Sequence, residues 1–235
     1  MTLIQAFFIQ WGQLLYSTFI EQQRYLMLLD GLKNTIIITL GALLIGIVLG
    51  TAVAVIKFLA EEKPALKPLA WLCNVYVTVV RGVPVVVLLL IFYFVILRSA
   101  DGIVTGIVAF GINSGAYMAE IIRGGINAVD GGQTEAARSL GFNRMAAMRF
   151  VVLPQAVKNI LPAIGNEMIA LLKETAVAGY VAVQDLTRAA NLIRNNTYDA
   201  LNPLLATAIV YLTMVVLLTA LLGKLEMRLR RSDVR

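Results

Sequence analysis

Five long apolar segments, separated by shorter polar or charged stretches, dominate the hydrophobic pattern of this chain. They cover residues 33–57, 69–97, 103–122, 154–183 and 204–222. Each is long enough for a helix that crosses a lipid bilayer, which takes about 20 apolar residues. The pattern therefore predicts an all-α, polytopic membrane protein with about five transmembrane helices.

The first 27 residues follow a different pattern. Apolar residues recur at helical spacing between Ile4 and Leu15, and glutamines interrupt them at Gln5, Gln10 and Gln13. This predicts an amphipathic helix that lies in the membrane interface, with an additional span as the alternative. We divide the chain into this interfacial helix (1–27), a transmembrane domain (28–228) and a basic tail (229–235).

The second apolar segment is too long for one straight crossing. Arg81, Gly82 and Pro84 interrupt it, and Gly and Pro in mid-membrane loosen a helix and free its backbone carbonyls. We expect a kinked or broken helix here, near the outer half of the membrane. A mid-membrane arginine needs an acidic partner or water, so Glu120 and Glu167 are candidate partners. The alternative is an arginine that extends to the lipid headgroups.

Composition supports the membrane class and narrows the chemistry. Apolar residues make up 59% of the chain and the mean hydropathy is +0.81. Histidine is absent, which excludes an imidazole base or ligand, and we expect no metal site. The single cysteine, Cys73, lies in an apolar run and is interpreted as a small buried hydrophobe. The composition thus favours neither a metalloprotein nor an enzyme.

The distribution of positive charge predicts the orientation. With five spans and the N-terminus outside, most Lys and Arg residues fall on the inside, within residues 57–67, 123–158 and 224–235. The positive-inside rule favours this arrangement, which places the C-terminus and residues 130–154 in the cytoplasm. The net charge of +6 is explained by this topology, and no nucleic-acid partner is expected.

The cytoplasmic segment 130–154 has the signals of two short helices. Asp130 and Gln133 have the spacing of a capping box, and Gly141 is placed to end the first helix. Asn143 can cap a second helix, which we expect to stop before the proline at 154. A compact helix pair with small alanines suits docking to a partner protein. A loop that rests on lipid headgroups is the alternative.

The same segment resembles a known motif. It reads EAARSLGFNRMAAMRFVVLP from Glu135 to Pro154, and is similar to the EAA motif of ATP-binding-cassette (ABC) importer permeases: E-A-A, three residues, G, nine residues, an aliphatic residue, one residue, L-P. The matching residues are Glu135, Ala136, Ala137, Gly141, Leu153 and Pro154. Val151 stands where isoleucine is usual. The wider sequence, including VRGVP and DLTRAAN, resembles polar amino acid permeases of the histidine, arginine and glutamine type from about residue 31 onward.

This resemblance implies a multi-pass permease of the bacterial cell (inner) membrane with the type I ABC importer fold. It implies a second permease copy or a homologous permease, two ATPase subunits that grip the EAA segment, and an extracellular or periplasmic solute-binding protein. ATP and Mg²⁺ would be bound by the ATPase, and no cofactor by this chain, which lacks a phosphate-binding G-x-x-x-x-G-K-[ST] loop. One departure is Leu88, where relatives often carry a glutamine.

Polar side chains in the third and fourth apolar segments predict a substrate pathway. Asn113, Tyr117 and Glu120 recur at intervals of four and three, so they share one helix face. The fourth segment offers a matching set: Asn166, Glu167, Glu174 and Thr175. Carboxylates that faced only lipid would cost too much free energy, so we predict a wet cavity near the bilayer midplane. Such a cavity suits a zwitterionic amino acid, and its acids favour a cationic side chain.

Two alternatives to this pathway stay open. Lys173 and Glu174 could cap the membrane interface, and Glu120 could pair structurally with Arg123 at i+3. At the level of function, the charges within the spans could serve a stand-alone, ion-coupled secondary carrier. Such a carrier would not need the docking segment at 130–154.

Overall fold

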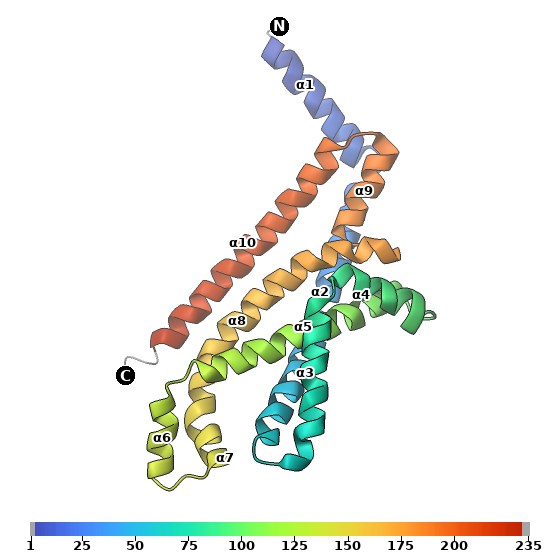
Figure 1. Ribbon diagram of the computed structural model, residues 1–235. Helices are drawn as coiled ribbons and strands as arrows, with labels where there is room; N and C mark the ends of the chain where they lie inside the picture. The colour runs from blue at the N-terminus through green and yellow to red at the C-terminus, as the bar shows by residue number, and fades with distance from the viewer. Residues whose placement is uncertain (1–2, 232–235) are drawn as a thin grey trace.

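The computed structural model describes residues 3–231, and every regular element within that range is a helix. Figure 1 shows long helices packed side by side, with a pair of short helices at one end and the α9–α10 turn at the other. The long helices are α2 (Tyr25–Ala60), α5 (Gly102–Asn127), α8 (Leu153–Glu174) and α10 (Leu201–Arg231). The shorter α-helices are α1 (Leu3–Leu15), α3 (Lys67–Gly82), α4 (Val85–Ile91), α6 (Gly131–Ser139), α7 (Arg144–Ala147) and α9 (Leu186–Thr197). The π-helical segments are η1 (Tyr16–Ile20), η3 (Phe92–Ile96) and η4 (Met148–Val152), and the 3₁₀ segments are η2 (Pro64–Leu66) and η5 (Thr175–Val181).

The centre of the molecule is the α2–α5 pair, which forms the most extensive contact between two helices. Glycines allow the close approach: a Cβ at Gly46 would lie 2.8 Å from Ser114 Oγ, and one at Gly50 would lie 2.8 Å from the backbone nitrogen of Ala119. Small residues at such spacing let membrane helices pack backbone to backbone. Gly46 and Gly50 therefore let α2 and α5 pack closely.

Three described helices are long and apolar enough to cross a membrane: Tyr25–Ala60, Gly102–Asn127 and Leu201–Leu229. The pair Pro64–Gly82 and Val85–Ile96, bent by 108° at its break, would be a fourth. The expected break at Arg81–Pro84 is therefore confirmed. The expected fourth apolar segment is less apolar than these, and its α-helix, α8, ends at Glu174 instead of continuing to residue 183. The count of five spans and the orientation of the termini stay predictions.

The N-terminal segment forms α1 and η1 and joins α2 through a turn at residues 21–24. Figure 1 shows α1 extending away from the helix bundle, beyond the turn between α9 and α10. Trp11 Nε1 donates to Asn202 Oδ1 (3.0 Å), and Thr18 Oγ1 donates to Asp199 Oδ2 (3.0 Å). Burial acts to raise the pKa of Asp199, but the hydrogen bonds from Asn202, Thr18 and Leu201 outweigh it and lower that pKa.

The boundaries of the three expected segments and the interfacial position of residues 1–27 stay predictions. In the expected basic tail, residues 229–231 continue α10, and residues 232–235 lie outside the described residues. Residues 1 and 2 lie outside them as well.

Candidate functional site: coupling loop and charged cavity

Residues 130–154 form the expected helix pair, which we call the coupling loop. Asp130 caps α6 by accepting from the backbone nitrogen of Gly132 (2.9 Å), and Asn143 caps α7 by accepting from that of Ala146 (2.8 Å). Gly141 lies between them with φ +90°, a left-handed conformation that glycine adopts without strain. The Gln133 side chain does not complete a capping box; it accepts a hydrogen bond from Gln155 (3.4 Å).

The second helix does not stop before Pro154, so that expectation was wrong. α7, η4 and α8 continue as one helical path through Leu153 and Pro154. Proline lacks a backbone N–H, which matters little in the first turn of a helix, and Pro154 stands in the first turn of α8. The wider π-helical turn of η4, which ends with a bond from the Leu153 nitrogen to the Met148 oxygen, precedes it. The coupling loop is thus joined directly to a long helix.

The EAA residues divide between the surface and the interior. Glu135 and Ala136 are exposed on α6, as are Leu153 and Pro154 at the start of α8. Ala137 is buried, with 4% of its surface accessible, so it packs inside the loop, although we expected it to face a partner. Sequence reasoning missed Leu140, an apolar side chain at the tip of the loop that is 80% exposed.

A contact that the sequence did not predict joins the coupling loop to the end of α2. Arg144 of α7 forms ion pairs with Glu61 and with Glu62 (3.9 Å for the latter), and its guanidinium lies 4.9 Å from the centre of the Phe58 ring. Glu61 and Arg144 are 83 positions apart in the chain, so no local spacing pattern could indicate the pair. The contact connects the two turns at this end of the molecule.

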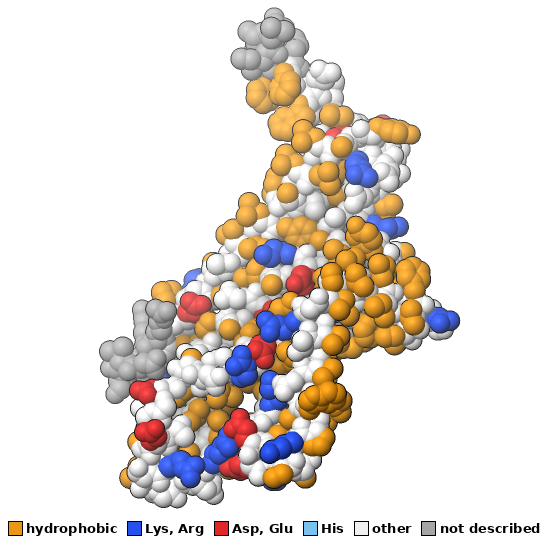
Figure 2. Space-filling model, in the orientation of Figure 1, with side chains coloured by type: hydrophobic (Ala, Val, Ile, Leu, Met, Phe, Trp, Pro, Cys, Tyr) orange, Lys and Arg blue, Asp and Glu red, His pale blue; other side chains and the backbone are white. Residues whose placement is uncertain are grey.

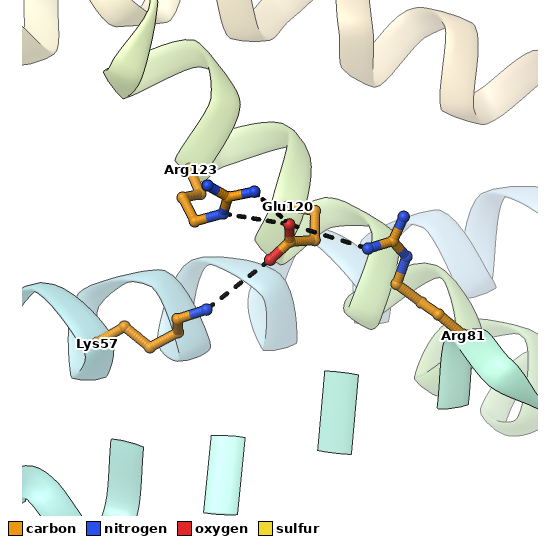
Figure 3. Close-up of polar contacts among 4 residues, drawn as sticks. All are labelled: Lys57, Arg81, Glu120 and Arg123. Atoms are coloured by element: carbon orange, nitrogen blue, oxygen red, sulfur yellow. Dashed lines mark hydrogen bonds and ion pairs between the residues drawn. The ribbon is translucent and has the colours of Figure 1, made fainter. Parts of the chain in front are cut away.

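Four charged side chains meet between α2, α3 and α5, as Figure 3 shows. Glu120 lies 2.6 Å from Arg123 Nη2, 3.8 Å from Lys57 Nζ and 3.8 Å from Arg81 Nη1. The Arg81 guanidinium also lies 5.1 Å from the centre of the Tyr117 ring, a favourable cation–π arrangement. The acidic partner of Arg81 is therefore Glu120, and Glu120 also pairs with Arg123, as the structural alternative proposed.

A cavity of about 460 Å³ opens beside this cluster. Its lining residues are Lys57, Asn74, Val77, Thr78, Arg81, Gly82, Tyr117 and Glu120. Asn74, Thr78 and Arg81 recur at intervals of four and three along α3, the same spacing that singled out the polar face of α5. That spacing was the signal by which Asn74 and Thr78 could have been found.

The other residues expected in one cavity lie elsewhere. Asn113 Nδ2 donates to Glu174 Oε2 (3.2 Å) and Ser114 Oγ donates to Glu167 Oε1 (3.0 Å), which ties α5 to α8. Thr175 is buried and donates to the Leu172 oxygen (2.7 Å), whereas Asn166 is exposed. Of the seven residues predicted for the pathway, Tyr117 and Glu120 line the cavity beside the charged cluster.

Among residues 3–231, no three His, Cys, Asp or Glu side chains are grouped so that they could hold a metal ion. The charged groups that do converge are basic side chains around one carboxylate. The charged site is thus basic overall, with one carboxylate at its centre.

Comparison with known proteins decides the family. A family model described as "binding-protein-dependent transport system inner membrane component" matches residues 46–231. The chain belongs to this family. It is therefore a multi-pass inner-membrane component of a binding-protein-dependent transport system, and the family resemblance read from the EAA motif is confirmed. A carrier that works alone does not fit such a system.

Two curated relatives match nearly the whole permease. The chain is 37% identical over 210 residues to the arginine transport system permease protein ArtQ of Bacillus subtilis, covering 88% of this chain and 94% of that protein. It is 37% identical over 209 residues to the probable glutamine ABC transporter permease protein GlnM of the same organism, with the same coverage.

Solved structures of permeases share the fold. The crystal structure of an amino acid ABC transporter with histidines aligns with a TM-score of 0.81 at 41% identity, over 86% of this chain and 94% of that one. A structure of the MetNI methionine ABC transporter aligns with a TM-score of 0.77 at 21% identity, over 90% and 99% of the two chains. The expected importer fold is thus confirmed.

Proposed function

We propose that this permease is the membrane subunit of an ABC importer for polar amino acids, driven by separate ATPase subunits that dock on the coupling loop. The observation that carries the proposal is the capped helix pair α6–α7, which presents Glu135, Ala136 and Leu140 to solvent and continues directly into α8. The names of the relatives, which cite arginine, glutamine and amino acid transport, support the substrate class.

The chain itself performs no catalysis in this proposal. ATP and Mg²⁺ belong to the ATPase subunits, and this chain binds no cofactor. A solute-binding protein delivers the amino acid from outside, and a second permease, identical or homologous, completes the pathway. Membrane lipid covers the apolar faces. One example is α10, in which only 6% of the residues in the most apolar stretch are buried.

Coupling follows from how the loop is attached. Glu135 lies in an exposed part of α6, where a basic residue of the ATPase can pair with it, and Gly141 and Ala137 shape the turn and the packing behind it. Motion of the docked loop passes to α8 through the continuous helix at Leu153 and Pro154. The 108° bend between α3 and α4, at Arg81, Gly82 and Pro84, is the proposed gate.

Acidic groups between α5 and α8 support a preference for basic amino acids. Glu167 and Glu174 each accept one hydrogen bond from α5, from Ser114 and Asn113, which leaves carboxylate lone pairs for a cationic substrate group. Asn166 and Thr175 are further polar residues of this part of the chain. We assign these residues to the pathway for the amino or guanidinium end of the substrate.

Uptake by the reconstituted complex tests the function. Permease, ATPase subunits and solute-binding protein are placed in liposomes, and uptake of radiolabelled arginine, lysine, histidine, glutamine and cystine is measured with and without ATP. ATP-dependent uptake of at least one of them is expected. A complex that takes up none, while its ATPase hydrolyses ATP, would overturn the proposal. Preference for glutamine over every basic amino acid would overturn only the proposed preference for basic substrates.

A further inference from the structure

The charged cluster beside the cavity has an imbalance of charge. Lys57, Arg81 and Arg123 bring three positive groups to one carboxylate, that of Glu120. Glu120 makes its short contact with Arg123, whereas Lys57 and Arg81 lie at 3.8 Å, a distance that leaves their N–H groups free to bind a further acceptor. Charged side chains within membrane-spanning helices are tolerated only when they pair with an opposite charge or reach water.

The cavity presents these two loosely paired cations together with neutral donors. Lys57 and Arg81 line it, whereas Arg123 does not; Asn74, Thr78 and Tyr117 add amide and hydroxyl groups. Its volume of about 460 Å³ falls in the range of small-molecule sites. Figure 2 shows that, on the face in view, charged side chains gather over the half of the molecule that holds the coupling loop. The lining is thus suited to an anionic group of a small polar molecule.

We infer that Lys57 and Arg81 form a subsite for the α-carboxylate of the transported amino acid. The inference rests on the proposed function and adds the group that this part of the pathway recognises. Glu120 does not hold the α-amino group here, because three cations already surround its two oxygens. It keeps Lys57 and Arg81 in place, and is a positioning residue.

The location of the subsite gives it a role in release. Lys57 stands one turn from the end of α2, beside Phe58 and Glu61, which contact Arg144 of the coupling loop. The Lys57 end of the subsite therefore faces the side of the membrane on which the ATPase is proposed to dock. An amino acid that enters from the opposite side meets this carboxylate subsite late in its passage, close to where the docking loop moves.

Paired ligands with and without the carboxylate test the inference. Binding to the detergent-solubilised permease–ATPase complex is measured by isothermal titration calorimetry. The probes are arginine and its decarboxylated analogue agmatine, and glutamine and its analogue 4-aminobutanamide. Because a hydrogen bond to a charged group is worth more than a neutral one, at least one amino acid should bind about tenfold more tightly than its analogue. Arg81→Gln should remove that difference and leave the affinity for the analogue unchanged.

Two further variants separate charge from folding. Arg81→Lys keeps the positive charge and should retain most of the affinity for the amino acid. Lys67→Gln removes one positive charge from the exposed opposite end of α3 and should bind as the wild type does. Assembly of each variant with the ATPase is checked by size-exclusion chromatography.

The inference is overturned if the wild-type complex binds each amino acid and its analogue equally, or binds none of the four probes. It is overturned as well if Arg81→Gln weakens the binding of an amino acid and of its analogue by the same factor. These outcomes are distinct from failure of the proposed function, which appears in the liposome assay as absence of ATP-dependent amino acid uptake by the wild-type complex.

Discussion

At the scale of single residues, Gly141 has the clearest physical requirement. Its φ of +90° lies in the left-handed region, and an added Cβ would meet no atom within 4 Å. Any cost of a side chain at this position therefore comes from backbone strain and from what docks on the exposed turn. For residues other than glycine, a left-handed backbone conformation costs about 1–2 kcal/mol.

We expect Gly141→Asp to abolish most ATP-driven uptake, with a loss of at least about tenfold, while the subunit still inserts in the membrane. The substitution strains the turn and adds a charge to the proposed docking surface. Uptake in liposomes and recovery of the permease in the membrane fraction are measured. Gly131→Asp is the matched control: it adds the same side chain in open space at the start of α6, where the helix dipole favours a negative charge. Normal uptake by Gly141→Asp would contradict the docking role.

At the scale of elements, Arg144 connects the coupling loop with the turn after α2. Its guanidinium contacts Glu61, Glu62 and the Phe58 ring, so movement of α7 and movement of the α2 end are linked. Such exposed ion pairs add little stability singly. Their value here is geometric, because they hold two separate turns in one arrangement.

We expect Arg144→Glu to reduce the number of substrate molecules transported per ATP hydrolysed by about two- to fivefold, because like charges would separate α7 from Glu61 and Glu62. Uptake and ATP hydrolysis are measured in the same liposomes. The double variant Arg144→Glu/Glu61→Arg should recover part of the ratio. Arg98→Glu, at an exposed position after η3 and outside the coupling loop, should leave the ratio unchanged. Failure of the double variant to improve on Arg144→Glu would argue against the link.

The packing of α2 on α5 makes a prediction about stability. We expect Gly50→Ala to lower the free energy of unfolding by about 1–3 kcal/mol, the usual cost of overpacking, because the new Cβ would lie 2.8 Å from the Ala119 backbone nitrogen. Thermal unfolding of the purified permease in detergent measures the change. Gly223→Ala in α10 has no atom within 4 Å of its Cβ and should be neutral or slightly stabilising. Equal melting temperatures for Gly50→Ala and wild type would refute the close contact.

At the scale of the whole molecule, the arrangement has two distinct ends. Figure 1 shows the coupling loop at one end and the turn between α9 and α10 at the other. Leu140 of the coupling loop is 80% exposed and Tyr198 of the opposite turn is 95% exposed. Their positions allow a direct test of the orientation that positive charge predicts.

We expect Leu140→Cys to react with a membrane-impermeant maleimide only in inside-out vesicles, and Tyr198→Cys only in right-side-out vesicles. Both are made in a Cys73→Ser background, which contains no other cysteine. The reason is that the ATPase side of the membrane should be the cytoplasmic side. Labelling of both positions from the same side would contradict the arrangement of the two ends, and a reversed pattern would contradict the orientation.

The sequence by itself determined the membrane class, the break at Gly82–Pro84, the capped helix pair and the family, because each depends on local features: apolar length, helix breakers, caps and motif spacing. It also placed Glu120 beside Arg123, an i+3 neighbour. The tertiary structure alone decided which distant groups meet. Lys57, Arg81 and Glu120 come from three helices, and Arg144 meets Glu61, which lies 83 positions away in the chain. Asn113 and Glu174 bind each other instead of lining the cavity with Tyr117. Helical spacing reports which side chains share a face, but only the rotation and packing of whole helices decide what that face contacts.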